Sequence, residues 1–197
     1  MKCIVCGTGP SLNLLPENID IKTIGVNDIF HSRKVDECLV VDPTRSFTKK
    51  MEYMQIIDCP FYCPNKIEWS PFVHSEITQF SFGRYFMEGY KENRSNWLNG
   101  GPKYLNIGHT SVFAALMLAS YYYDEIGLIG CDINACGHAW NNDGHKHKLN
   151  LILPSIQKDF QFANKVLREN GVTVWNLSPI SAVTAFTKKP VEEFLNN

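Results

Sequence analysis

The chain has 197 residues, a length that suits one domain and is sufficient to bury a hydrophobic core. Hydrophobic residues make up 44% of it, charged residues 20%, and the formal net charge is −1, which argues against a general attraction to nucleic acid or membrane surfaces. No apolar run approaches the roughly 20 residues that cross a bilayer, and the N-terminus does not resemble a signal peptide. The sequence therefore predicts a cytoplasmic protein without a membrane span.

The seven cysteines are expected to be reduced and mostly buried. Cys3 and Cys6 have the spacing of a redox or zinc pair, but they lie in a predicted strand, where residues three apart point to opposite faces. No second CxxC pair follows that would complete a four-cysteine zinc site. We therefore expect these thiols to be structural.

Short apolar runs alternate with helical patterns along the chain. Strands are predicted, in chain order, at 3–6, 22–26, 38–41, 61–63, 126–131 and 172–175. Helices are predicted at 11–15, 110–123 and 155–170, with a short one near the C-terminus. Near-continuous apolar strands that alternate with helices indicate a parallel sheet with helices on both faces. The predicted fold is α/β and Rossmann-like, with one domain over residues 1–197.

The least regular part of the chain is 65–108, which is rich in aromatic residues and contains a Gly-Gly-Pro sequence at 100–102. It is predicted to be an insertion within the domain, either a lid over the acceptor or a contact between copies in a homo-oligomer. Arg84 and Arg94 fall in it, and they could reach phosphates or lie on a surface loop.

Polar residues follow five of the predicted strands, and in such sheets ligands bind beyond the carboxyl ends of the strands. Each residue alone could be a turn former, but five coincident strand ends favour a ligand-binding crevice. In chain order these residues are Gly7, Thr8, Gly9, Pro10 and Ser11, then Asn27, Asp42, Asp132 with Asn134, and Asn176 with Ser178.

The first turn, Gly7 to Ser11, has the residues of an anion-binding turn. Its glycines allow close backbone approach to a ligand, Pro10 suits the first turn of a helix, and Ser11 can cap it. The helix start is then predicted to expose N–H groups to a phosphate. Thr110 and Ser111 begin the long helix, where they form either a second anion site or simple caps.

The residues after the second and third strands suit a nucleoside. Asn27 offers a donor and an acceptor for a ribose or a base edge. Asp42 could accept from sugar hydroxyls or hold a divalent cation such as Mg²⁺ through water.

Histidines gather in the sequence CGHAWNNDGHKH at 136–147. His138, His145 and His147, near Asp143, could supply a general acid or base at neutral pH. They could also bind a metal, or lie on a solvated polar loop. His31 and His74 are isolated and are expected to be structural or surface residues.

Six segments carry a resemblance, in order along about nine-tenths of the chain. They are IVCGTGPSL at 4–12, GVNDIF at 25–30, VVDPTRSF at 40–47, HTSVFAALMLA at 109–119, IGLIGCDIN at 126–134 and WNLSPISAVTAF at 175–186. They resemble the superfamily of family 42 bacterial sialyltransferases and archaeal 6-hydroxymethylpterin diphosphokinases. The histidine-rich pattern is most similar to that of short phage and bacterial members of unassigned reaction.

The resemblance implies a cytidine nucleotide donor held by residues at matching positions, namely Thr8, Gly9, Ser11, Asn27, Asp42, Thr110 and Ser111. It also implies a histidine base downstream of the G-x-D motif, with His145 or His147 as the candidate. Two positions depart from the sialyltransferase pattern. Asn134 stands where those enzymes have a tyrosine, and Gly108-His109 stands where they have an arginine shortly before Thr-Ser.

Three functions remain as hypotheses. The leading one is a nucleotide-dependent, glycosyltransferase-like enzyme with a CMP- or UDP-type sugar donor, an unknown acceptor and a histidine base. The second is Mg²⁺-dependent diphosphate transfer from ATP, with Asp42 or Asp132 near the metal. Asp132 is also a candidate catalytic residue, beside the three histidines. The third is a non-catalytic nucleotide-binding module or phage assembly factor.

Overall fold

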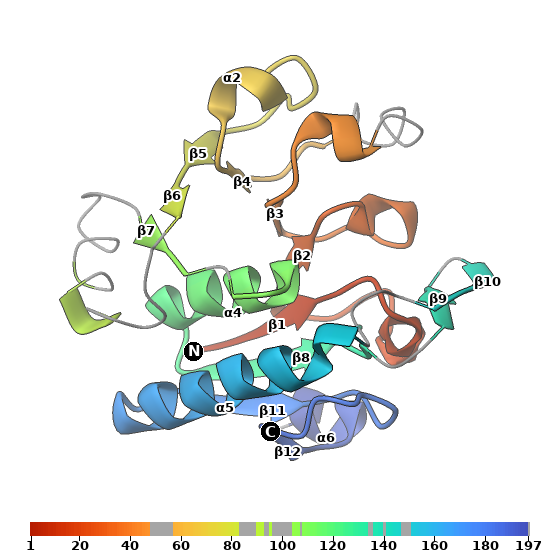
Figure 1. Cartoon of the computed structure of the whole chain (residues 1–197), viewed down its shortest axis with the longest axis vertical. Coiled ribbons are helices and arrows are strands. Elements are labelled where there is room, and N and C mark those ends of the chain that lie inside the picture. Colours follow the sequence, from red (N-terminus) through yellow and green to blue (C-terminus); the bar gives the residue numbers. More distant parts are fainter. Residues whose placement is uncertain are drawn as a thin grey trace.

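The protein folds around one large parallel sheet, seen in Figure 1. The structure is a computed structural model, and it describes residues 1–47, 57–82, 90–92, 95, 104–106, 108–133, 136–139, 141–146 and 151–196. Its main sheet has eight strands in the order β12-β11-β8-β1-β2-β3-β4-β5, and every neighbouring pair is parallel. The fold is therefore α/β, with the parallel sheet that the sequence predicted.

The strands of the main sheet are short. They are β1 (Lys2–Cys6), β2 (Lys22–Val26), β3 (Glu37–Leu39), β4 (Phe61–Cys63), β5 (Ile77–Gln79), β8 (Glu125–Ile129), β11 (Thr173–Asn176) and β12 (Thr187–Lys188). Two further pairs lie outside this sheet, namely β6 (Ser81–Phe82) with β7 (Tyr104–Leu105), and β9 (Cys136–His138) with β10 (Asn141–Lys146).

Helices cover both faces of the sheet, and the alternation of side chains along the strands builds a core on each face. On one face α4 (Ser111–Tyr122) and α5 (Leu153–Glu169) pack in a cluster with Cys3 and Val5 of β1. On the other face Ile4 and Cys6 pack with residues of several helices. These are the 3-10 helices η1 (Pro10–Leu14), η2 (Ile29–His31) and η3 (Thr44–Phe47), together with α2 (Lys66–Trp69) and α6 (Val191–Asn196).

Helix α4 is buried along its length. Thr110 is its N-cap, and residues 112–121 are all buried. The reason is that other segments cover the side away from the sheet. Phe113 packs against Phe160 of α5. The Tyr90 hydroxyl donates to the Ser120 carbonyl of α4, and the Tyr121 hydroxyl donates to the Tyr104 carbonyl of β7.

The predicted strands were found in the structure with shifts of up to two residues at their ends, but the sheet is wider than predicted. Strands β5 and β12 extend its two edges, and both are too short to give a periodic pattern. Because α2 and β5 fall within 65–108, this range is not wholly irregular, and its first part belongs to the main sheet. Arg84 and Arg94 lie outside the described residues, so the lid remains a prediction.

The expectation for the cysteines is confirmed at six positions. Cys3, Cys6, Cys38, Cys59, Cys63 and Cys131 are buried and free. Cys3 and Cys6 lie in the clusters on opposite faces of the sheet, so they cannot act as a pair. Burial raises the pKa of the Cys6 thiol to about 12, which keeps it protonated and unreactive.

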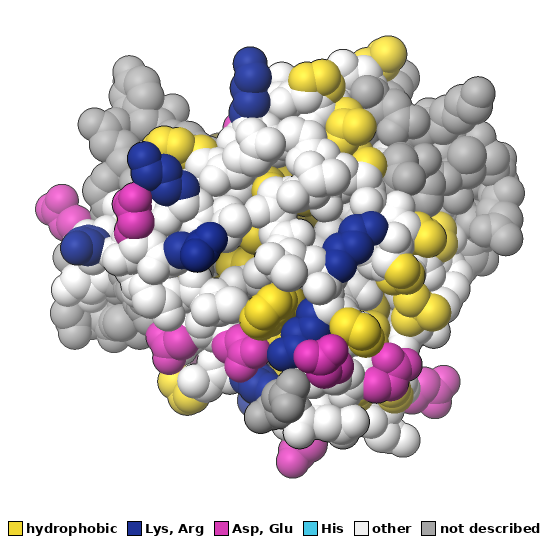
Figure 2. Space-filling view, turned by 90° about the horizontal axis from the view of Figure 1, so that it is seen from below, with side chains coloured by type: hydrophobic (Ala, Val, Ile, Leu, Met, Phe, Trp, Pro, Cys, Tyr) yellow, Lys and Arg dark blue, Asp and Glu magenta, His cyan; other side chains and the backbone are white. Residues whose placement is uncertain are grey.

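Figure 2 shows the face of the molecule that is seen from below Figure 1. Acidic and basic side chains are interspersed there with apolar ones, without a field of a single sign. Within the described ranges, no helix has the length and apolar character needed to span a membrane.

Candidate functional site

A cavity of about 350 Å³ opens at the carboxyl ends of β1, β2 and β8. This is the point where the strand order reverses, because β1 lies between β8 on one side and β2 on the other. In open parallel sheets such a switch point is the usual position of a ligand. The volume lies in the range of small-molecule sites.

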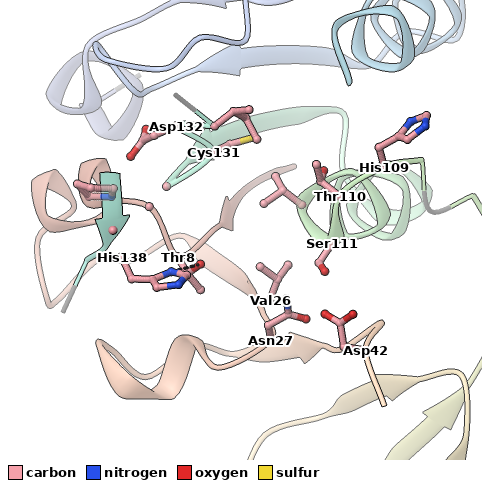
Figure 3. Close-up of a pocket in the computed structure, with 16 residues that line it drawn as sticks. Thr8, Val26, Asn27, Asp42, His109, Thr110, Ser111, Cys131, Asp132 and His138 are labelled. Carbon is pink, nitrogen blue, oxygen red and sulfur yellow. Dashed lines mark hydrogen bonds between the residues drawn. The ribbon is translucent and has the colours of Figure 1, made fainter. Parts of the chain in front are cut away.

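Nine residues that the sequence analysis selected line this cavity, and Figure 3 labels seven of them. They are Thr8, Gly9, Pro10, Asn27, Asp42, Thr110, Ser111, Asp132 and His138. The prediction that polar strand ends would meet along one edge is thus realised for the first, second, third and fifth predicted strands. Gly7, Ser11, Asn176 and Ser178 do not line it.

Asp132 joins three of these segments below the cavity surface. Its side chain accepts from the Ser11 backbone N–H at 2.7 Å, the Ser11 hydroxyl at 2.6 Å and the Ser178 hydroxyl at 2.5 Å. Asp132 is only 2% exposed, and both of its carboxylate oxygens are occupied. The geometry gives Asp132 a structural part and leaves it poorly suited to the catalytic or metal-binding part suggested by the sequence.

The first turn is built for close packing against the end of β8. The backbones of Gly7 and Gly130 meet so closely that a Cβ atom on Gly7 would lie 2.4 Å from the Gly130 carbonyl oxygen. Gly130 also has a φ of +69°, which favours glycine. Glycines are therefore needed here for contact within the protein, whereas the sequence analysis had expected contact with a ligand.

The N–H groups of this turn are largely taken by the protein, which corrects a second expectation. Gly9 donates to the Gly130 carbonyl, Pro10 has no N–H, and Ser11 donates to Asp132. The Ser11 hydroxyl also accepts from Gly130 instead of capping η1. The start of η1 therefore offers little to an anion.

The start of α4 is better suited to bind an anion than the start of η1. Thr110 caps the helix by accepting from the Phe113 N–H at 3.1 Å. No described residue accepts from the N–H groups of Ser111 and Val112, and both residues line the cavity. The helix has 12 residues, and its positive end favours an anion here.

Asn27 and Asp42, the two residues that the sequence suggested for binding a nucleoside, both line the cavity. Burial raises the pKa of the Asp42 carboxyl above its ordinary value, an effect that the neighbouring Asn27 side chain partly offsets. The Asn27 Oδ1 atom is buried and accepts no hydrogen bond in the described structure. Asp42 lines the cavity beside this buried oxygen, so this corner favours a ligand that brings hydrogen-bond donors.

Backbone strain concentrates at the same place. Within the described ranges two residues other than glycine have positive φ angles, Asn27 at 52° and Ile133 at 57°. Both line the cavity. Such a conformation is uncommon for a β-branched residue, and strain of this kind clusters at functional sites.

Of the predicted histidines, His138 reaches the cavity. Its Nδ1 atom lies 3.2 Å from the Thr8 hydroxyl, and the Ala139 N–H donates to the Thr8 carbonyl at 2.8 Å. These contacts hold β9 against the first turn. His145 lies in β10, but its side chain is not described, and His147 and Asn134 lie outside the described residues.

A histidine that the sequence did not single out also lies at this site. His109 lines the cavity directly before the N-cap of α4, and its Nδ1 atom lies 2.5 Å from Oδ2 of Asp159 on α5. The partner is 50 residues away in the chain, so no local spacing could reveal the pair. The one signal was its position beside Thr110 and Ser111.

Among the described residues, no group of three or more histidine, cysteine or acidic side chains is arranged to hold a metal ion. The carboxylates that line the cavity there are Asp42 and Asp132, and Asp132 is already occupied. This donor set is a poor fit for a dedicated Mg²⁺ site.

Comparison with solved structures identifies the sialyltransferase CstII as a protein of similar fold. A crystal structure of CstII in complex with a trisaccharide acceptor and CMP matches with a TM-score of 0.55 and 18% sequence identity, over 100% of this chain and 89% of that chain. A structure of monomeric CstII matches with a TM-score of 0.50 and 16% identity, over 95% and 85% of the two chains. No protein-family model and no curated protein sequence matches.

The whole chain therefore adopts a fold similar to that of CstII, in agreement with the sialyltransferase part of the resemblance. The resemblance to pterin diphosphokinases and to phage and bacterial proteins stays a prediction.

Proposed function

We propose that this chain is a nucleotide-dependent, glycosyltransferase-like enzyme with a CMP- or UDP-type sugar donor. The observation that carries the proposal is the cavity at the switch point of a fold that is similar, over the whole chain, to a sialyltransferase crystallised with CMP. The second substrate is an acceptor with a hydroxyl group, and the bond broken in the donor is the sugar–phosphate bond.

The polar groups of the cavity suggest how the donor lies in it. The Ser111 and Val112 N–H groups have no acceptor among the described residues, and together with the Ser111 hydroxyl they suit the phosphate. The Asn27 Oδ1 and Asp42 carboxylate suit two donors in the same molecule, as a ribose diol provides.

A histidine at the edge of the cavity takes the acceptor proton in this proposal. The sequence favoured the segment that contains His138, His145 and His147. His138 is the member of that set whose side chain is described, and it contacts Thr8 of the first turn.

The alternative of Mg²⁺-dependent diphosphate transfer receives less support, because Asp132 is engaged by Ser11 and Ser178. Nothing specific favours the non-catalytic alternative. The two enzymatic hypotheses differ in the substrate and the metal that they require. Metal-free turnover of a nucleotide sugar supports the transferase, and strict dependence on ATP with Mg²⁺ supports the diphosphokinase.

The proposal is tested by thermal unfolding with CMP, CDP, UDP, GDP and ATP, each with and without Mg²⁺. A ligand at about 100 times its dissociation constant stabilises the fold by about 2.7 kcal/mol, which raises the melting temperature by about 5–10 °C. We expect such a shift with a pyrimidine nucleotide in the absence of metal.

The matched variants are Ser111→Ala in the cavity and Ser70→Ala outside it. Ser70 is exposed at the end of α2, and its hydroxyl donates only to the backbone carbonyl of Ile67. The shift should fall for Ser111→Ala and persist for Ser70→Ala. If no nucleotide stabilises the wild-type protein, the proposed function is wrong.

A further inference from the structure

A histidine and an aspartate from different helical segments meet at the edge of the cavity. His109 lies in the turn before α4, and Figure 3 shows its ring extending from the α4 end of the cavity toward α5. There its Nδ1 atom lies 2.5 Å from Oδ2 of Asp159. The His109 side chain is 46% exposed and that of Asp159 is 18% exposed. The imidazole is thus accessible while its partner is largely covered.

The backbone is shaped to bring this pair together. Gly108 has a φ of +49°, and a Cβ atom at this position would lie 2.8 Å from ring carbons of Phe113 and 3.0 Å from Oδ2 of Asp159. Only glycine lets the turn pass this close to α5 without a shift of its neighbours. The contact therefore depends on a specific local structure and does not arise from two long side chains that meet on a surface.

The partner of Nδ1 determines what the other nitrogen can do. A carboxylate accepts hydrogen bonds and does not donate, so Nδ1 carries the proton in the neutral ring. Nε2 then holds a lone pair, which is the arrangement of a general base. Among the described residues, Asp159 is the one hydrogen-bond partner of the His109 side chain.

The Asp159 carboxylate also offsets the unfavourable interaction between a protonated His109 and the N-terminus of α4. The positive end of α4 disfavours a cation beside it, and His109 stands immediately before the N-cap. A carboxylate in contact with Nδ1 stabilises the imidazolium that forms when Nε2 takes a proton. His138 contacts a neutral hydroxyl instead, at the opposite wall of the cavity.

We infer that His109, oriented by Asp159, is the general base toward the acceptor of the proposed transferase, an inference that rests on the proposed function. The acceptor hydroxyl gives its proton to Nε2 of His109, and its oxygen forms the new bond to the anomeric carbon of the sugar. The bond from that carbon to the phosphate oxygen breaks, and its electron pair stays with the nucleoside phosphate. His138 remains with Thr8 on the other side of the cavity.

The test is chemical rescue in the full-length protein. His109→Ala should lower kcat for transfer from the nucleotide-sugar donor by about 10²–10⁴-fold, with the donor KM nearly unchanged. Added imidazole should restore a large part of that loss in His109→Ala, because it supplies the missing base. Asp159→Asn should give a smaller loss of kcat. His74→Ala is the matched control, since His74 is an exposed histidine outside the cavity.

The outcomes separate the two proposals. Rescue of His109→Ala by imidazole, with nucleotide stabilisation as in the wild type, supports His109 as the base. Full kcat in His109→Ala overturns this inference and leaves the transferase proposal standing. So does imidazole rescue that occurs in His138→Ala, His145→Ala or His147→Ala but not in His109→Ala. If the wild-type protein neither binds a nucleotide nor turns over a nucleotide sugar, both proposals are overturned.

Discussion

Asp132 is the single residue on which the turns after β1, β8 and β11 converge. Three donors from Ser11 and Ser178 are buried against its carboxylate, and none has water as an alternative partner. Asp132→Ala should therefore lower the free energy of unfolding by about 3 kcal/mol, because it leaves these donors unpaired. Urea unfolding measures the change.

Asp20→Asn is the matched control for Asp132, because Asp20 is exposed and the substitution should change stability by less than about 0.5 kcal/mol. Asp132→Asn keeps one acceptor oxygen and should fall between the two. Equal stability of Asp132→Ala and the wild type would contradict the structural part that we give to Asp132.

Alanine substitutions at two glycines with positive φ angles distinguish the cost of backbone strain from the cost of steric crowding. Gly171→Ala, at φ +78° with nothing within 4 Å of the added Cβ, should cost about 1 kcal/mol. Gly130→Ala, at φ +69°, adds a contact at 2.2 Å with the Gly7 carbonyl oxygen and should cost about 1–3 kcal/mol more. Denaturant midpoints of the two variants, compared at equal slope, test this difference.

At the scale of single residues, the sequence predicted which strand ends carry polar side chains but not what each side chain contacts. Thr8, Asn27 and Asp42 line the cavity as expected, whereas Ser11 and Ser178 turn inward to Asp132. The local sequence of a turn does not show whether its polar side chain faces the cavity or the protein interior. The difference depends on an acceptor more than 40 residues away, which local patterns do not contain.

At the scale of elements, α4 links the hydrophobic core to the cavity through its first turn. Thr110→Ala removes the cap on the Phe113 N–H and should cost about 1 kcal/mol, which lowers the melting temperature by about 2–4 °C. Thr110→Ser keeps the hydroxyl and should retain most of the stability. Because the cap holds the helix start in place, the alanine variant should also weaken nucleotide binding, measured by calorimetry.

A normal melting temperature for Thr110→Ala would mean that the cap contributes little in this buried helix.

The elements themselves were largely predictable, and the exceptions have physical causes. β1, β2 and β4 are short, mostly buried runs, and their predicted ends lie within one residue of the structure. Gly7 follows β1, and Pro60 and Pro64 flank β4. β12 has two exposed residues and β5 none that is buried, so neither shows the pattern of a core strand. They join the sheet because its edges offer unpaired backbone groups.

At the scale of the whole molecule, the candidate function has a cost in stability that pH can reveal. Burial raises the pKa of Asp42 and of Glu37, partly offset by hydrogen bonds from Asn27 and Tyr62. For Asp36, burial is outweighed by hydrogen bonds from Thr23 and Lys22, so its pKa is lowered. The pH dependence of the free energy of unfolding of the wild-type protein therefore combines opposing contributions from these three carboxyl groups.

A comparison with Asp42→Asn isolates the cavity carboxylate. With a raised pKa, folded Asp42 keeps its proton to higher pH than the unfolded chain, so the folded state binds more protons within that interval. Stability from this residue is therefore present below its ordinary pKa of 3.8 and is lost as pH rises through the folded value. Wild-type stability minus that of Asp42→Asn should fall as pH increases through this interval and level off above it.

The same variant should bind nucleotide about tenfold more weakly at neutral pH, because an amide offers one acceptor oxygen where the carboxylate offers two. Asp42→Asn would thus stabilise the free protein above that interval while it weakens the nucleotide complex, the opposition expected of a group kept for binding. Urea unfolding from pH 3 to 7 and calorimetry with the stabilising nucleotide measure the two effects. If the stability difference rises with pH, or if the affinity for the nucleotide is unchanged in Asp42→Asn, Asp42 is not part of the nucleotide site.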